Sequence, residues 1–271
     1  MARQAQAGCD QQQNNHNHRE NLTLASALPL AGGAQETMSE RSLPYRPEID
    51  GLRALAVLSV ILFHLNRQWL PGGFVGVDIF LVISGYLITS ILYHDLKSDQ
   101  FGFMKFYQRR IARIFPAFFT VALSTITVAY FIYSEHDLAR AGSNLFAASM
   151  SLTNIKYMLL GDYFKISLDA EPFMHYWSLS IEEQYYLLFP LLLFVTFRYA
   201  RNYLVTILAL ILVISLAGCI LFTPVNSVWT FYLLPTRAWE LFAGCLLAIV
   251  EGNSTGPMRV PAWVPLGGVI L

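Results

Sequence analysis

Apolar stretches long enough to cross a lipid bilayer recur along this chain, and they restrict its possible folds more than any other feature. A transmembrane helix needs about 20 mostly apolar residues. Six stretches reach or approach that length: Leu52–Trp69, Gly73–Tyr93, Ile114–Tyr133, Ile181–Phe197, Tyr203–Phe222 and Trp229–Val250. Charged residues make up only 13% of the chain, whereas about a quarter is usual in soluble domains. The sequence therefore predicts an all-α fold, a multi-pass transmembrane helical bundle.

A seventh apolar stretch begins at Ala262 and continues to Leu271. We therefore expect about six complete spans plus a truncated seventh, in a membrane domain of residues 45–271 that is incomplete at its C-terminal end. The segment Asn144–Met158 is short and rich in Asn, Ser and Thr, so we interpret it as a re-entrant or interfacial helix. Residues 134–180 around it are expected to form an external acidic segment.

Residues 1–44 differ from the rest of the chain. They include the tract Gln11–Asn15 and have no apolar periodicity, so we expect a disordered polar tail. The 18 basic and 18 acidic residues of the chain balance, which gives no reason to expect nucleic acid as a partner. The three cysteines lack metal-ligand spacing, and no metal site is expected.

A basic segment lies between the second and third apolar stretches and contains Lys105, Arg109, Arg110 and Arg113. Short basic loops remain on the cytoplasmic side of a membrane, so this segment is expected there. The N-terminus is then also cytoplasmic, and the first span runs outward.

Ionisable residues inside a span are costly and usually functional. Arg53 and His64 lie eleven residues apart in the first stretch, so on a helix they share a face and stand about 16 Å apart along the axis. Each also has a structural explanation: Arg53 as an interfacial residue that extends to the membrane surface, and His64 as a helix-end imidazole bonded to a carbonyl. Asp78 is a candidate partner for either residue.

Three further sets of charged residues need an explanation. Ser180 and Glu183 have the spacing of a capping box, which accounts for Glu183 but leaves Glu182 unexplained. Arg237 and Glu240 are three residues apart, so an ion pair within one helix is expected. Arg110 and Arg113 share a helical face and have the geometry to hold a phosphate through bidentate hydrogen bonds; the alternative is that they only orient the chain in the membrane.

Four motifs of this chain together resemble acyltransferase family 3, a family of membrane enzymes that O-acylate cell-surface carbohydrates. They are Tyr45–Val57 continuing to His64, Gly73–Thr89, Phe106–Ala117 and Trp177–Gln184, in the family's order and spacing. The family's Arg-x10-His pair falls on Arg53 and His64, and its Arg-x-x-Arg motif falls on Arg110 and Arg113. The resemblance extends from Tyr45 to about Leu271.

The resemblance implies a bacterial plasma-membrane O-acyltransferase that moves an acyl group, expected to be acetyl, from cytoplasmic acyl-CoA to a carbohydrate hydroxyl. Acyl-CoA is then a donor substrate, with no bound cofactor. His64, Arg53 and Glu182 are the catalytic candidates, and Arg110 and Arg113 are the candidates for donor binding. His64 acts either as general base or as a nucleophile that carries the acyl group. The alternative is a polytopic transporter with Arg53, His64 and Glu182 along its path.

Overall fold

We describe the protein from a computed structural model that defines residues 46–161 and 171–253, and every regular element within these ranges is helical. The longer helices are α2 (Pro47–Leu65), α3 (Gly76–Lys97), α4 (Phe103–Ile132), α7 (Tyr176–Tyr199), α8 (Leu204–Phe222) and α10 (Leu234–Asn253). The shorter ones are α5 (Glu135–Ser149), α6 (Thr153–Leu160), α9 (Ser227–Tyr232) and the 3-10 turns η2 (Gly73–Val75) and η4 (Arg201–Tyr203). The predicted tail (residues 1–44) and the apolar stretch after Ala262 lie outside the described residues.

Four helical segments are long and apolar enough to cross a membrane: Gly73–Lys97, Phe103–Ile132, Arg201–Phe222 and Ser227–Asn253. They coincide with four of the six predicted spans. Of the other two predicted spans, Leu52–Trp69 extends four residues beyond the end of α2, and Ile181–Phe197 lies within α7. Both helices carry several charged side chains and do not meet the same measure. The all-helical membrane fold is therefore confirmed, whereas six or seven spans are not.

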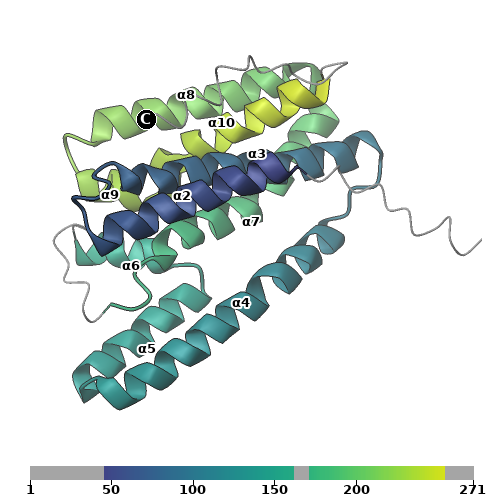
Figure 1. Cartoon of the computed structure of the whole chain (residues 1–271). Helices are drawn as coiled ribbons and strands as arrows, with labels where there is room; N and C mark the ends of the chain where they lie inside the picture. The colour runs from purple at the N-terminus through teal and green to yellow at the C-terminus, as the bar shows by residue number, and fades with distance from the viewer. Residues whose placement is uncertain (1–45, 162–170, 254–271) are drawn as a thin grey trace, which may run out of the picture. The chain divides into compact units, whose positions relative to one another are not determined.

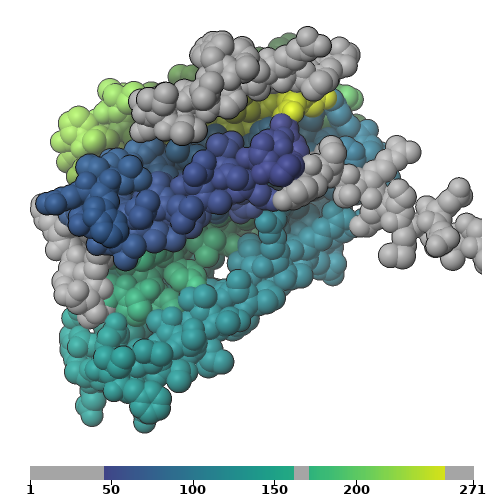
Figure 2. Space-filling model, in the orientation of Figure 1, coloured from purple at the N-terminus to yellow at the C-terminus, as the bar shows by residue number. Residues whose placement is uncertain are grey.

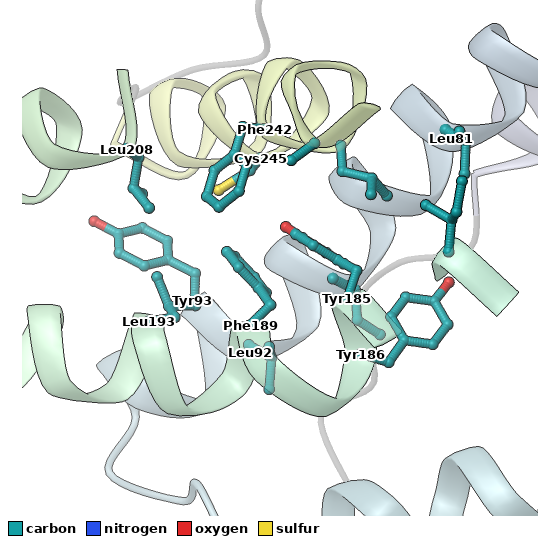
Figure 3. Packing of buried hydrophobic residues seen from close by; sticks show 14 of the residues in the cluster. Leu81, Leu92, Tyr93, Tyr185, Tyr186, Phe189, Leu193, Leu208, Phe242 and Cys245 are labelled. Carbon is teal, nitrogen blue, oxygen red and sulfur yellow. The ribbon is translucent and has the colours of Figure 1, made fainter. Parts of the chain in front are cut away.

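Helix α3 packs against α2, α7 and α10, and α8 packs against α10, so these helices run side by side (Figure 1). Their shared core is strongly aromatic. The rings of Tyr185 and Phe189 stack with centroids 4.5 Å apart, and Phe242 of α10 meets both edge-on. Cys245 is fully buried in the same cluster (Figure 3).

The contact between α3 and α10 depends on two glycines, one on each helix. A Cβ atom at Gly85 would lie 2.0 Å from the carbonyl oxygen of Leu241, and one at Gly244 would lie 1.9 Å from that of Val82. Neither distance is possible for real atoms, so the two backbones approach as closely as they do only because both positions lack a side chain.

Helix α4 lies largely outside this core. Near its N-terminal end, Phe106 is buried and the hydroxyl of Tyr107 donates a hydrogen bond of 2.9 Å to the carbonyl of Leu187 in α7. Further along, Ala122 packs with Ala148 of α5 and with Phe173. The predicted basic segment forms the first turns of α4, and the helix continues through Pro116.

The region between α4 and α7 differs from the prediction. Asn144–Met158 is not one helix: α5 ends at Ser149, Ser151 has a left-handed φ of 54°, and α6 begins at Thr153. Residues 162–170 of the segment expected to be external lie outside the described residues; in the rest of it, Glu171 is buried and accepts hydrogen bonds from Asn144 and Tyr157. This buried carboxylate anchors the chain just before α7.

The capping box predicted at Ser180 is wrong. Helix α7 begins four residues earlier, at Tyr176, and the Ser180 hydroxyl accepts a 3.3 Å hydrogen bond from the backbone N–H of Thr153. Ser180 therefore joins α7 to α6 instead of starting a helix.

Helix α2 lies at the surface, shown in purple in Figure 2. Its outward side chains include Leu55, Leu58 and Leu62, all exposed in the protein alone. An apolar helical face of this kind is expected where the surrounding solvent is lipid.

Candidate active site

A cavity of about 600 Å³, which we call the main cavity, lies between α2, α3, the start of α7 and the α9–α10 region. Most of its wall is apolar. Besides the hydroxyl group of Ser178, four ionisable side chains interrupt this wall: His64 from α2, Asp78 from α3, His175 at the start of α7 and Arg237 from α10. Because these residues lie far apart in the sequence, the fold itself assembles the site.

His64 is held by its own helix. Its Nδ1 atom lies 2.8 Å from the carbonyl oxygen of Val60, which confirms the structural explanation of this residue, a helix-end imidazole bonded to a carbonyl. A carbonyl oxygen only accepts hydrogen bonds, so Nδ1 carries the proton and Nε2 carries the lone pair of the neutral imidazole. This arrangement makes Nε2 the basic atom of the ring.

His175 is the second histidine of the cavity. Its ring meets that of His64 edge-on, with centroids 4.7 Å apart. The side chain is accessible from the cavity, yet partial burial among protein atoms lowers the pKa of His175, and the nearby His64 lowers it further. Both effects favour the neutral form of His175. The sequence marks the region around His175 as unusually polar for the start of a span, but it does not single this residue out.

Two glycines fix the distance between α2 and the segment that leads into α3. A Cβ atom at Gly73 would lie 2.3 Å from the carbonyl oxygen of Ser59, and one at Gly76 would lie 2.3 Å from that of Ala56. The helix bearing His64 therefore packs directly against the backbone of the α3 N-terminus.

Arg237 forms a buried ionic group with two carboxyl groups. It donates hydrogen bonds to Asp78, to Glu240 at 2.8 Å and to the carbonyl oxygen of Phe231 at 3.1 Å. The predicted Arg237–Glu240 pair is thus confirmed. Asp78, which the sequence offers as a candidate partner for Arg53 or His64, forms its ion pair with Arg237, from a distant part of the sequence. The sequence does not identify Arg237 as a site residue.

Arg53 and Glu182 do not line the main cavity. The guanidinium of Arg53 lies over the ring of Phe80, 5.2 Å from its centroid. Glu182 is buried and accepts a hydrogen bond from the hydroxyl of Tyr186. The cation of Arg110 lies 5.1 Å from the ring centroid of that same tyrosine.

We call Arg53, Arg110, Arg113, Glu182 and Tyr186 the arginine cluster. Arg110 interacts electrostatically with the other four members, so the fold brings these predicted residues together in one region. Arg113 is exposed, Arg110 is half-buried and Glu182 is buried. Since Arg53 is near the N-terminal end of α2 and His64 is in its last turn, the arginine cluster and the main cavity lie toward opposite ends of that helix.

No group of three or more His, Cys, Asp or Glu side chains in residues 46–161 and 171–253 has the arrangement to hold a metal ion.

Comparison with known proteins identifies the family of this chain. A family model described as "Acyltransferase domain" matches residues 46–271. O-acetyltransferase OatA of Staphylococcus aureus (strain NCTC 8325 / PS 47) is 37% identical over 211 residues, which are 76% of this chain and 35% of that relative.

A second relative, Peptidoglycan O-acetyltransferase OatA of Listeria monocytogenes serovar 1/2a, is 37% identical over 215 residues, which are 77% of this chain and 34% of the relative. The chain thus spans about a third of the length of these relatives. No solved structure matches it. The motifs quoted from the sequence, the match over residues 46–271 and these relatives lead to one conclusion: the chain belongs to acyltransferase family 3.

Proposed function

We propose that this chain is the membrane domain of an enzyme that transfers an acetyl group from cytoplasmic acyl-CoA to a hydroxyl of a cell-wall carbohydrate. Family membership and the names of the relatives support the reaction class. The proposal rests on one observation. His64 lies on the wall of the 600 Å³ cavity, and its Nδ1 atom is hydrogen-bonded to the carbonyl oxygen of Val60, which leaves Nε2 as the basic atom of the ring.

His64 acts as general base in this proposal. Nε2 of His64 removes the proton from the acceptor hydroxyl while its oxygen attacks the thioester carbonyl carbon. The new C–O bond forms, the C–S bond breaks, and the imidazolium returns the proton to the departing thiolate. Arg237 borders the same cavity, but Asp78 and Glu240 balance its charge, so the scheme assigns it no charge-stabilising role. The other route, acyl transfer to His64 and then to the sugar, uses the same residues.

The arginine cluster is proposed to hold the donor. Acyl-CoA carries phosphates, and guanidinium groups bind phosphate through paired hydrogen bonds. Exposed Arg113 and half-buried Arg110 are suited to this role, and Arg53 adds a third cation. Glu182 holds Tyr186, which lies against Arg110, so we assign Glu182 a positioning role in the donor site.

This scheme also proposes a topology. The basic start of α4 lies on the cytoplasmic side, where acyl-CoA is made, and the N-terminus lies on that side as well. The C-terminal end of α2, with His64, then faces the side from which the carbohydrate comes. Residues 1–44 are proposed to be a tail separate from the catalytic domain of residues 45–271. The transporter alternative gains no support from the relatives, and neither Arg53 nor Glu182 lines the main cavity.

The test compares His64→Ala with His136→Ala, which alters an exposed histidine outside the cavity. Membrane vesicles receive radiolabelled acetyl-CoA and peptidoglycan glycan strands, and label on the glycan is measured. We expect His64→Ala to reduce transfer by about 10²–10⁴-fold and His136→Ala to match the wild type. Wild-type rates in His64→Ala would contradict the role of His64. Label that stays unattached to glycan in wild-type vesicles would contradict the function itself.

A further inference from the structure

A second cavity, about 390 Å³, lies beside the main one. Asp78, Phe231 and Arg237 belong to the walls of both cavities, so Arg237 stands at the boundary between them. The rest of the second wall comes from the C-terminal end of α8, from α9 and from the first turns of α10. The donor scheme proposed above leaves this cavity without a role.

Two polar atoms in this wall lack a hydrogen-bond partner among the described residues. They are Nε1 of Trp239 and Oε2 of Glu240, and both are buried. Glu240 is only 1% exposed, and its other oxygen, Oε1, already binds Arg237. A buried donor and a buried acceptor without partners destabilise the protein unless another group satisfies them. An unpartnered donor and an unpartnered acceptor in one wall suit a ligand that offers both kinds of group.

The rest of the wall has the same chemical character. Hydroxyl-bearing Thr223, Ser227 and Thr230 line it, together with the aromatic rings of Phe231 and Trp239. Its carboxyl and guanidinium side chains are those of Asp78, Glu240 and Arg237, two acidic groups against one cation. Acidic groups in excess disfavour a phosphate-bearing ligand, and the unpartnered polar atoms disfavour an alkyl chain. A sugar ring, with hydroxyls that donate and accept and apolar C–H faces, satisfies all of these features.

We propose that the second cavity binds a sugar residue of the carbohydrate acceptor. Glu240 Oε2 accepts a hydrogen bond from one sugar hydroxyl, and Trp239 Nε1–H donates one to a sugar oxygen. The bound sugar then presents its reacting hydroxyl past Arg237 into the main cavity, toward Nε2 of His64. This assignment rests on the proposed function, for which it supplies the acceptor site.

The cavity contains its own reporter, because Cys219 lies in its wall and is a free, partly accessible thiol. The experiment measures the rate at which N-ethylmaleimide modifies Cys219 in the full chain in detergent, by mass spectrometry of the peptide that contains it. We expect soluble peptidoglycan glycan strands to slow this modification and acetyl-CoA to leave it unchanged. Slowing by acetyl-CoA alone would assign the cavity to the donor and overturn the proposal.

Kinetics of Trp239→Phe provide the second measurement, since this change removes one N–H donor and keeps an aromatic ring. We expect the KM for the glycan to rise about five- to tenfold and the KM for acetyl-CoA to stay within about twofold. Glu240→Gln should act in the same direction. The controls are Trp229→Phe and Glu135→Gln, which make the same changes at exposed positions outside the cavity.

The failure of this proposal differs from the failure of the proposed function. If the wild type acetylates glycan but glycan does not slow the modification of Cys219, the acceptor site is wrong and the function stands. If glycan slows the modification while no acetyl group is transferred, the cavity binds carbohydrate and the function is wrong. The labelling measurement needs only wild-type protein, so it decides the matter even if Trp239→Phe does not fold.

Discussion

Replacing Gly76 with alanine tests whether the packing of α2 against α3 sets the position of His64. A Cβ atom there would lie 2.3 Å from the carbonyl oxygen of Ala56 and 2.3 Å from Oγ of Ser59. The serine side chain can rotate, but the carbonyl belongs to the backbone of α2. An ordinary contact begins at about 3.4 Å, so α2 must move by about 1 Å relative to α3.

That displacement is large on the scale of catalysis. A misplacement of about 1 Å in a catalytic group costs about 10²-fold in rate, while overpacking of a buried contact typically costs about 1–3 kcal/mol of stability. We therefore expect Gly76→Ala to lower the rate of acetyl transfer by about 10²-fold and to lower the apparent Tm by a smaller, measurable amount. Initial rates and thermal unfolding of the purified protein in detergent measure the two effects.

Gly72→Ala is the matched control, four residues away in the same connection. A Cβ atom at Gly72 would meet nothing within 4 Å, and its φ of −86° is accessible to alanine. This variant should keep wild-type rate and stability. Equal transfer rates in Gly76→Ala and Gly72→Ala would refute the argument that this backbone contact positions His64.

Three other predictions follow from the sites described above. Replacing Arg110 or Arg113 with lysine keeps the charge but removes the guanidinium fork, so the KM for acetyl-CoA should rise while the KM for glycan stays constant; unchanged donor affinity in both would favour a purely topological role. Deletion of residues 1–44 should leave membrane insertion and transfer rates intact, as fractionation and the vesicle assay would show. The pKa of His175 is lowered in the folded protein, so the unfolded chain binds the proton more tightly. The free energy of unfolding should therefore fall as pH drops below about 6.5. In thermal unfolding, the difference in Tm between pH 7.5 and pH 5.5 should be smaller for His175→Gln than for the wild type.

The sequence predicts those parts of the fold that depend on length and local chemistry. Tyr203–Phe222 is long and wholly apolar, and such a segment is a helix in any membrane protein. The pair Arg237–Glu240 is likewise local, because residues three apart on a helix meet whatever surrounds them. These features do not require knowledge of which helices are neighbours.

The features that the sequence predicted wrongly, or did not reveal, depend on tertiary neighbours. Asp78 has several candidate cations, and the choice of Arg237 follows only from the contact between α3 and α10, which the glycines at 85 and 244 make close. Ser180 has capping-box spacing, but Thr153 of a separate helix uses its hydroxyl. His175 becomes part of the cavity because the start of α7 lies beside the end of α2.

Phe80 stands where the two proposed sites meet. The guanidinium of Arg53, a member of the arginine cluster, lies 5.2 Å from the centroid of the Phe80 ring. Phe80 also lines the main cavity, as His64 does. Arg53 and His64 are about 16 Å apart along one continuous helix, so a donor held by its phosphates at the cluster must extend past Phe80 for its thioester to reach Nε2. On the proposed function, this ring is the side chain that the donor's flexible arm must pass. The long, uncharged arm of acyl-CoA suits such a route, because the phosphates remain in water with the arginines while only uncharged groups enter the apolar cavity.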